Sequence, residues 1–307
     1  MSEARVEPSR RVTVRAPAKI NLHLGVGRPR PDGLHPLSTV YQAVGLYDDV
    51  TVTDSFDWEV GLTADVDGVP LDDTNIAIRA GRALAEHHRI DREVAARITI
   101  AKGIPVMGGM AGGSADAAAT LLALDRLWDL QTPDDELLRI AGTLGSDVPF
   151  ALLGGTAMGT GHGQLVSAVP DQTSVWWVVV LSDEGLSTPA VYRHFDELSP
   201  DAPEAPPVPE ELLDALAEGY VDEVRDLLAN DLWPAARDLR PDLVEVEERL
   251  RALDAEGVLL SGSGPTLLML HDDVDAARAA AAEVMELGLR CTLAPGPVAG
   301  AHVVTYA

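Results

Sequence analysis

The chain has 307 residues, enough for two domains or one large one, and its 46% hydrophobic content is typical of a globular protein with a substantial core. A net charge of −26 argues against binding to nucleic acid or to an anionic membrane surface, since both require basic protein surfaces. The chain has no apolar run of membrane-spanning length, no apolar stretch near its N-terminus and a single cysteine, Cys291. We therefore expect a cytoplasmic protein without an internal disulfide.

Lysine is rare in this chain, which makes its two occurrences informative. Of the 23 basic residues only Lys19 and Lys102 are lysines, and the others are arginines. A compact ammonium group and a planar guanidinium are not interchangeable in a binding site. The two lysines are therefore candidates for positions that function requires, because an anionic ligand in so acidic a protein needs local cations.

The first structured stretch is predicted to be a strand. Residues 12–26 alternate between apolar and other side chains, which places Lys19, Asn21 and His23 on one face. The following stretch, RPRPDGLHP at 28–36, predicts a loop because it is rich in proline and glycine.

Less distinctive elements follow. We expect a strand over 49–53, a loop around 65–68 and a helix over 75–88 that is capped by Asp73 or Thr74.

The most informative stretch of the sequence is residues 102–128, KGIPVMGGMAGGSADAAATLLALDRLW. A short alternating strand precedes it, four glycines fall between residues 108 and 113, and strong helix formers run from Ala115. A glycine loop at a helix N-terminus favours phosphate, because unpaired backbone N–H groups converge there with the helix dipole. Neither GxxxxGK[ST] nor GxGxxG matches the loop. The alternative is a tight helix-entry turn without a ligand.

The segment after this helix contains a second candidate. A helix is expected over 132–145, and GSDVPFALLGG follows it. Asp147 is a candidate catalytic carboxylate, but Ser146 or Asp147 could instead cap the short helix VPFALL. On its own, capping is at least as good an explanation for Asp147. Residues 156–166 are predicted to form a glycine-rich turn, and 176–181 a fully buried strand.

The acidic, proline-rich stretch 199–210 predicts an exposed connector. Beyond it the pattern indicates a compact α+β lobe. Helices are expected at 210–229, 241–254 and 273–287, and strands at 258–260, 266–270, 290–293 and 302–305. SGSGP at 261–265 is a second glycine-rich turn, either functional or merely connecting.

Three segments together resemble the GHMP kinases (galactose, homoserine, mevalonate and phosphomevalonate kinases). They are APAKINLHLGVG at 16–27, PVMGGMAGGSADAA at 105–118 and LSGSGPTLLM at 260–269. RPDGLHPLSTVYQAV and LGSDVPFALLGGTAMGTGHG narrow the resemblance to members that act on a cytidine-diphosphate-linked polyol in isoprenoid biosynthesis.

The resemblance implies an α+β, two-lobed GHMP kinase fold, with a ribosomal-S5-like N-terminal lobe and a ferredoxin-like C-terminal lobe. We expect an ATP-binding and catalytic domain over 1–165 and a C-terminal domain over 166–307, with the active site between them. The implied activity is ATP- and Mg²⁺-dependent phosphorylation of an alcohol on a small molecule.

Site residues are carried over from the family's motifs. The resemblance implies that Asp147 is the catalytic base and Lys19 its electrostatic partner. Substrate contacts are implied for Asn21, His35 and Tyr192, and Ser114 is a possible magnesium ligand. The ATP phosphate loop comprises Pro105, Val106, Met107, Gly108, Gly109, Met110, Ala111, Gly112, Gly113, Ser114 and Ala115.

The sequence departs from the family's motifs at three positions in or beside the expected site. Leu34 stands where an aromatic residue usually precedes His35, and Ala115 and Asp116 replace a common Ser-Asn pair. Two other functions remain open at this point. One is another GHMP kinase, of the homoserine or mevalonate type, and the second is a non-catalytic nucleotide-binding protein, although such a protein would need neither Lys19 nor Asp147.

Overall fold

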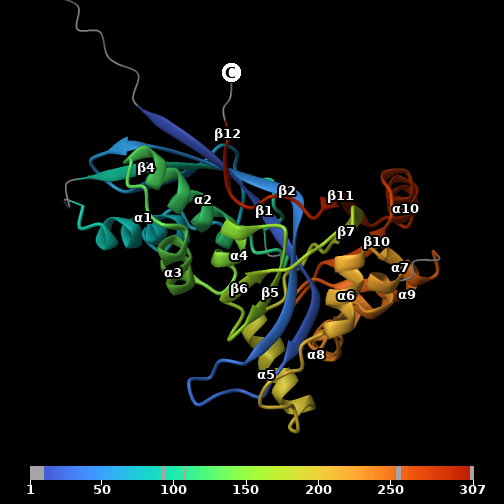
Figure 1. The fold of residues 1–307 in the computed structure, drawn as a ribbon. Coiled ribbons are helices and arrows are strands. Elements are labelled where there is room, and N and C mark those ends of the chain that lie inside the picture. Colours follow the sequence, from blue (N-terminus) through green and yellow to red (C-terminus); the bar gives the residue numbers. More distant parts are fainter. Residues whose placement is uncertain (1–9, 91–93, 107, 254–256, 305–307) are drawn as a thin grey trace, which may run out of the picture.

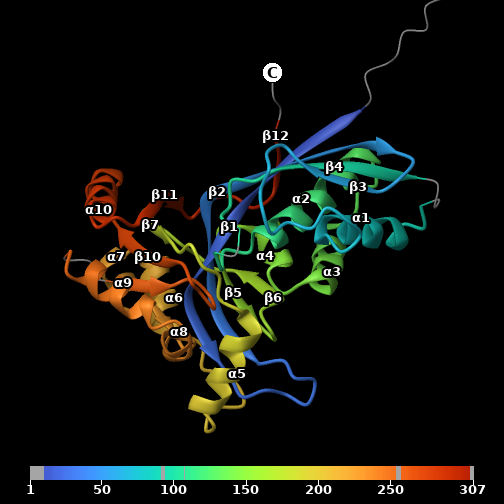
Figure 2. The same cartoon turned by 180° about the vertical axis from the view of Figure 1, so that it is seen from behind.

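The computed structural model describes residues 10–90, 94–106, 108–253 and 257–304, and within them it contains two β-sheets. Figure 1 shows the long strands β1 and β2 passing through the middle of the molecule, with helices α1 to α4 on one side and helices α6 to α10 around the second sheet. Figure 2 shows the same division from behind.

The first sheet is built on a long antiparallel pair, β1 (Arg11–Val26) and β2 (Leu37–Ser55). The path of the sheet is β12-β1-β2-β4-β3, in which β3 is Glu59–Leu62, β4 is Ala95–Ala101 and β12 is His302–Val304. A hairpin of β5 (Thr156–Thr160) and β6 (Leu165–Ala168) pairs with β2, and the short β8 (Ala229–Asn230) pairs with β1.

Three helices contact this sheet: α1 (Ile76–His87), α2 (Gly112–Leu127) and α4 (Val148–Leu153). A fourth, α3 (Asp134–Leu144), packs on these helices. The central one is α2, which contacts α1, α3, α4, β1 and β2. Its small alanine side chains are buried, so it approaches the sheet and its neighbours closely. This packing fixes the glycine loop at the start of α2 against the middle of β1.

The second sheet is antiparallel, in the order β11 (Arg290–Gly296), β7 (Val175–Leu181), β10 (Leu267–His271) and β9 (Val258–Leu260). The helices of this half are α5 (Thr188–Leu198), α6 (Glu210–Glu218), α7 (Val221–Asp226), α8 (Trp233–Leu239), α9 (Asp242–Arg251) and α10 (Val274–Glu286). The mixed α+β architecture expected from the sequence is confirmed.

Several predicted boundaries are wrong. The strand expected at 49–53 is the last part of β2, which already begins at Leu37. The first half of β2 was missed because it is buried on both faces and therefore lacks an alternating pattern. Residues 156–166 are a β-hairpin, not only a turn. The glycines in the hairpin obscured it: Gly159 lies within β5, where a Cβ atom would meet the ring of Tyr41 at 2.5 Å.

Helix ends also differ from the predictions. Asn75, not Asp73 or Thr74, caps α1, and its side chain accepts a hydrogen bond from the Ala77 N–H. The helix after the glycine loop begins at Gly112, inside the loop. Residues 210–229 form two helices, because Gly219 ends α6 in the left-handed conformation. Helix α8 was not predicted, and Trp176 and Leu181 are only half-buried.

The division into domains at residues 165 and 166 stays a prediction. Strand β6 crosses the predicted boundary and pairs with β5. Strand β12, from the second segment, pairs with β1, so the C-terminal part of the described chain returns to the N-terminal half.

Candidate active site

A cleft of about 680 Å³ lies where the two halves of the molecule meet, and several of the predicted site residues line it. Its walls come from β1, β2, the glycine loop, the turn before α4, helix α5 and the SGSGP turn. The predicted site residues among its lining are Lys19, Asn21, His35, Gly109, Ala111, Ser114, Asp147 and Tyr192. Residues that are more than 170 positions apart in the chain, such as Lys19 and Tyr192, thus meet in one site.

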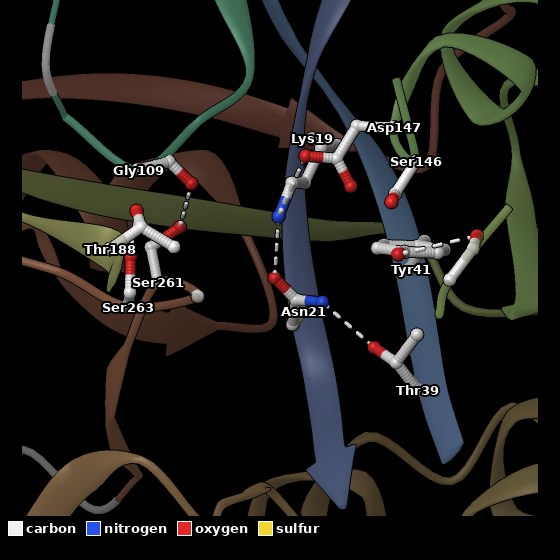
Figure 3. Close-up of polar contacts among 12 residues, drawn as sticks. Lys19, Asn21, Thr39, Tyr41, Gly109, Ser146, Asp147, Thr188, Ser261 and Ser263 are labelled. Atoms are coloured by element: carbon white, nitrogen blue, oxygen red, sulfur yellow. Dashed lines mark hydrogen bonds and ion pairs between the residues drawn. The ribbon is translucent and has the colours of Figure 1, made fainter. Parts of the chain in front are cut away.

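Lys19 and Asp147 face one another in this cleft (Figure 3). The Nζ atom of Lys19 lies 3.8 Å from Oδ2 of Asp147 and donates a 2.7 Å hydrogen bond to Oδ1 of Asn21. It also lies 5.4 Å from the centre of the Tyr41 ring. Lys19 is only 8% exposed, so its ammonium group is held in one position by these neighbours.

The backbone of β1 explains how these side chains come together. The register of β1 on β2 shifts between Pro17 and Ala18 and again between Asn21 and His23, which are β-bulges or irregularities that change the direction of side chains. Between the shifts, Lys19 and Asn21 project together, and the amide of Asn21 donates onward to Thr39 Oγ1 at 2.7 Å. His23 was expected on the same face, but it lies beyond the second shift.

Asp147 occupies the N-cap position of α4 without acting as a cap. Its side chain makes no hydrogen bond to the first turn of the helix. The carboxylate is 29% exposed and is oriented toward Lys19, as Figure 3 shows. The capping explanation for this aspartate is therefore wrong, and its catalytic role stays a prediction.

Two tyrosines beside Asp147 are kept protonated. Burial raises the pKa of Tyr41 and of Tyr192 above the ordinary value, and the nearby negative charge of Asp147 raises both further. Their hydroxyl groups are consequently available as hydrogen-bond donors at any physiological pH.

The glycine loop separates the first cleft from a second cavity of about 400 Å³. Gly109 and Ala111 line both cavities, and α2 begins directly after Ala111. The Lys19 N–H donates to the Met110 carbonyl at 3.2 Å, which attaches the loop to β1. Met107 lies outside the described residues. The second cavity is lined by the described loop residues from Pro105 to Gly113 and by Gly68, Val69, Pro70, Thr74, Asn75, Ile76, Lys102 and Asp116. Ala115 is fully buried and lines neither cavity.

Lys102 sits beneath the loop in a buried ion cluster. Its Nζ donates to Oδ2 of Asp48 and, at 2.8 Å, to Oδ2 of Asp116. Asp48 also accepts from the backbone N–H groups of Gly103 and Ile104 at 2.8 and 2.9 Å. Burial alone would lower the pKa of Lys102, but the two carboxylates outweigh burial and raise that pKa. This second lysine therefore supports the loop as part of the fold.

An aromatic pair, His35 and Tyr192, also lines the first cleft. The rings of His35 and Tyr192 lie 4.8 Å apart with an angle of 42° between their planes. Nε2 of His35 is 2.8 Å from Oδ1 of Asp196, a residue of α5 that the sequence did not single out. Leu34, which replaces the usual aromatic residue, is 45% exposed at the rim.

Sequence reasoning also missed a polar pair beside Asp147. Ser146 Oγ and His162 Nδ1 lie 2.7 Å apart, and both residues line the cleft. The segment that contains His162 was used only as part of the family resemblance and of the predicted glycine-rich turn. The contact between Ser146 and His162 is visible only in the fold.

Among the residues that the structure describes, no three His, Cys, Asp or Glu side chains gather closely enough to hold a metal ion. In the same part of the chain, no helix is long and apolar enough to cross a membrane. Ser114 lies in the first cleft and remains the protein's candidate magnesium contact.

Comparison with known proteins identifies the family. The model of the GHMP kinases N terminal domain matches residues 75–155, and that of the GHMP kinases C terminal domain matches residues 212–287. A protein from a Nocardioides species named 4-diphosphocytidyl-2-C-methyl-D-erythritol kinase is 58% identical over 96% of this chain and 100% of its own length. One from Thermobifida fusca with the same name is 48% identical over 95% and 98%.

Solved structures agree with this assignment. A crystal structure of 4-(cytidine 5'-diphospho)-2C-methyl-D-erythritol kinase is similar with a TM-score of 0.75 and 34% identity, covering 93% of this chain and 99% of its own. A homoserine kinase from Cytophaga hutchinsonii shares the fold, with a TM-score of 0.73 over 99% and 100% of the two chains, but is only 17% identical. The chain belongs to the GHMP kinase family, in its branch of 4-diphosphocytidyl-2-C-methyl-D-erythritol kinases.

Proposed function

We propose that the chain transfers the γ-phosphoryl group of ATP to the 2-hydroxyl of 4-diphosphocytidyl-2-C-methyl-D-erythritol. The observation that carries the proposal is the Lys19–Asp147 pair, which faces a cleft next to the glycine loop. Phosphoryl transfer needs alignment and charge stabilisation, and this arrangement supplies both.

Each group has a defined task in the reaction. Asp147 accepts the proton of the attacking hydroxyl, whose oxygen forms the new bond to the γ-phosphorus while the bond to the β-phosphate oxygen breaks and ADP leaves. Lys19 lies 3.8 Å from the Asp147 carboxylate and offsets negative charge on the transferring group. The backbone N–H groups of the loop and the N-terminus of α2 bind the phosphates of ATP.

The family implies ATP with Mg²⁺, and the residues present fit that pair. Ser114 offers a hydroxyl oxygen in the cleft, and magnesium takes most of its remaining ligands from phosphates and water. The absence of a cluster of acidic ligands among the described residues agrees with a metal held mainly by the nucleotide. When bound, the metal neutralises charge on the phosphates.

The shape of the first cleft supports the choice of acceptor. His35 and Tyr192 form an aromatic wall suited to a nucleobase, in the same cleft as Lys19, Asn21 and Asp147. A cytidine-diphosphate-linked polyol has a base for the aromatic wall and a hydroxyl for the Lys19–Asp147 pair. Proteins named for this substrate are 58% and 48% identical to the chain. The similarity to homoserine kinase, at 17% identity, concerns the fold alone.

The reaction takes place in the cytoplasm in our proposal, where ATP is available, and it requires no nucleic acid, membrane or protein partner.

A substrate panel tests the proposed function. ADP release by the purified protein is measured with ATP and Mg²⁺ and one acceptor at a time. The acceptors are 4-diphosphocytidyl-2-C-methyl-D-erythritol, homoserine, mevalonate and galactose. We expect turnover with the cytidyl compound only. Turnover with another acceptor would keep the kinase and overturn its substrate, and ATP binding without turnover on any acceptor would favour a non-catalytic protein.

A further inference from the structure

Asn230 joins three parts of the site without lining the cleft. It lies in β8, a two-residue strand between α7 and α8. Its side-chain amide donates to the carbonyl oxygens of Leu260 and Gly262, at 2.9 and 2.7 Å. Its Oδ1 accepts from the Leu232 N–H at 2.9 Å. Both amide hydrogens and the oxygen are thus used, so the amide has one orientation.

The position of Asn230 is fixed by the strand that carries Lys19. Strand β8 pairs in parallel with β1 at His23 and Leu24. The next residue, Asp231, donates its N–H to the Leu24 carbonyl at 2.9 Å and accepts from the Val26 N–H at 2.8 Å. Asn230 therefore connects β1 to the SGSGP turn, which comes from the second half of the molecule.

The SGSGP turn, which Asn230 holds, contacts both the Lys19–Asn21 pair and the glycine loop. A Cβ atom at Gly262 would lie 3.5 Å from Nζ of Lys19 and 3.4 Å from Oδ1 of Asn21, so the backbone of the turn lies directly beside this pair. Ser261 Oγ donates to the Gly109 carbonyl at 3.3 Å, a contact drawn in Figure 3.

The approach of the turn to the glycine loop is equally close. A Cβ atom at Gly109 would lie 2.7 Å from the Ser261 carbonyl oxygen and 2.8 Å from that of Gly264. Gly109 also has φ of +72°, so only glycine fits there without strain. A displacement of the SGSGP turn would move the loop that binds the phosphates.

We infer that Asn230 is a positioning residue that sets the spacing between the Lys19–Asp147 pair and the phosphate loop through the SGSGP turn. The part of this inference that concerns turnover rests on the proposed function, and the part that concerns ATP binding does not.

The test compares Asn230→Asp and Asn230→Ala with wild type. The aspartate keeps the acceptor for Leu232 but cannot donate to the two carbonyls, and the alanine removes every bond. We expect a loss of about tenfold or more in kcat/KM for both, because two hydrogen bonds to backbone carbonyls disappear. The loss should appear as a lower kcat and a higher Kd for ATP.

A matched control separates positioning from stability. Asp273 caps α10 in the same half of the molecule, where its carboxylate accepts from the N–H groups of Asp275 and Ala276. Asp273→Ala should lower the unfolding temperature while leaving kcat and the Kd for ATP unchanged. If this control loses as much activity as Asn230→Asp, the effect is one of stability and the inference is wrong.

A double-mutant cycle completes the test. Asn230→Ala and Ser261→Ala act through the same turn, so their effects on ATP affinity should be non-additive, whereas Asn230→Ala and Asp273→Ala should add. Additive effects for the first pair, or an unchanged Kd for ATP in Asn230→Asp, would overturn the inference. If wild type fails to phosphorylate the acceptor, the proposed function fails, but the ATP measurements still decide the role of Asn230.

Discussion

Asp147→Asn is the substitution that separates chemistry from folding most clearly. The side chain makes no capping bond to α4 and is partly exposed, and asparagine has nearly the same shape. Lys19 keeps its 2.7 Å bond to Asn21 when the charge of Asp147 is lost. We therefore expect the free energy of unfolding to change by no more than about 1 kcal/mol, the usual contribution of a partly exposed ion pair.

The expected loss of activity is much larger than the loss of stability. A positioned general base contributes about 10² to 10⁴ in rate, so kcat should fall by that factor. The asparagine still occupies the space between Lys19 and the acceptor, so the Kd for ATP should stay within about threefold of wild type. A second readout comes from Tyr41 and Tyr192, because the charge of Asp147 helps to raise the pKa of both. Both pKa values should fall in the variant.

The assay is coupled ADP release at saturating ATP and acceptor, with thermal unfolding and ultraviolet titration of the tyrosines run on the same preparations. Asp134→Asn provides a control, since this aspartate lies in the exposed first turn of α3, away from the cleft. A kcat for Asp147→Asn within about threefold of wild type would refute its assignment as the base.

Three further substitutions test other parts of the account. Lys19→Met should lower kcat by about 10²- to 10³-fold, the usual cost of removing one charge-stabilising donor, and a drop below threefold would argue against that role. Tyr192→Ala should raise the KM for the acceptor about tenfold by removing a stacking surface beside His35, and should leave the Kd for ATP unchanged; an unaltered KM would show that the base binds elsewhere. Burial raises the pKa of Asp116 from 3.8 to about 8, with Lys102 opposing and Asp48 reinforcing the shift. The folded state thus binds the proton of Asp116 more tightly than the unfolded state. The stability that this proton confers is fully present below about pH 4 and is lost as the pH rises through about 8. Asp116→Asn should therefore gain stability relative to wild type between pH 5 and pH 9 in thermal unfolding, and a constant difference across that range would contradict the sign.

The parts of the site that the sequence predicted are those with a local signature. The glycine loop was visible because a strand, four glycines and an alanine-rich helix follow one another in the chain. The pairing of Lys19 with Asp147 came from the family resemblance alone, since nothing local connects two residues 128 positions apart. For Asp147 taken by itself, helix capping was as good an explanation, and only the direction of its side chain in the fold rejects it.

Other features depend on contacts that no local pattern contains. The rarity of lysine marked Lys102 for function, but its partners are Asp48 and Asp116, and the three form a support under the loop. The first half of β2 was missed because both of its faces are buried, and α8 was missed because Pro234, which is tolerated in a first helical turn, resembles a break. Asn230 lies in a two-residue strand without a local sequence pattern, and its bonds to Leu260 and Gly262 are visible only in the fold.

The most direct test of the central claim is to identify the product. Wild-type protein is incubated with ATP, Mg²⁺ and 4-diphosphocytidyl-2-C-methyl-D-erythritol, and the acceptor is followed by phosphorus and carbon NMR. We predict one new phosphomonoester, on the 2-hydroxyl, formed in equal amount to ADP and absent with Asp147→Asn over the same period. ADP without a phosphorylated acceptor, or a phosphate on a different hydroxyl, would contradict the proposed reaction.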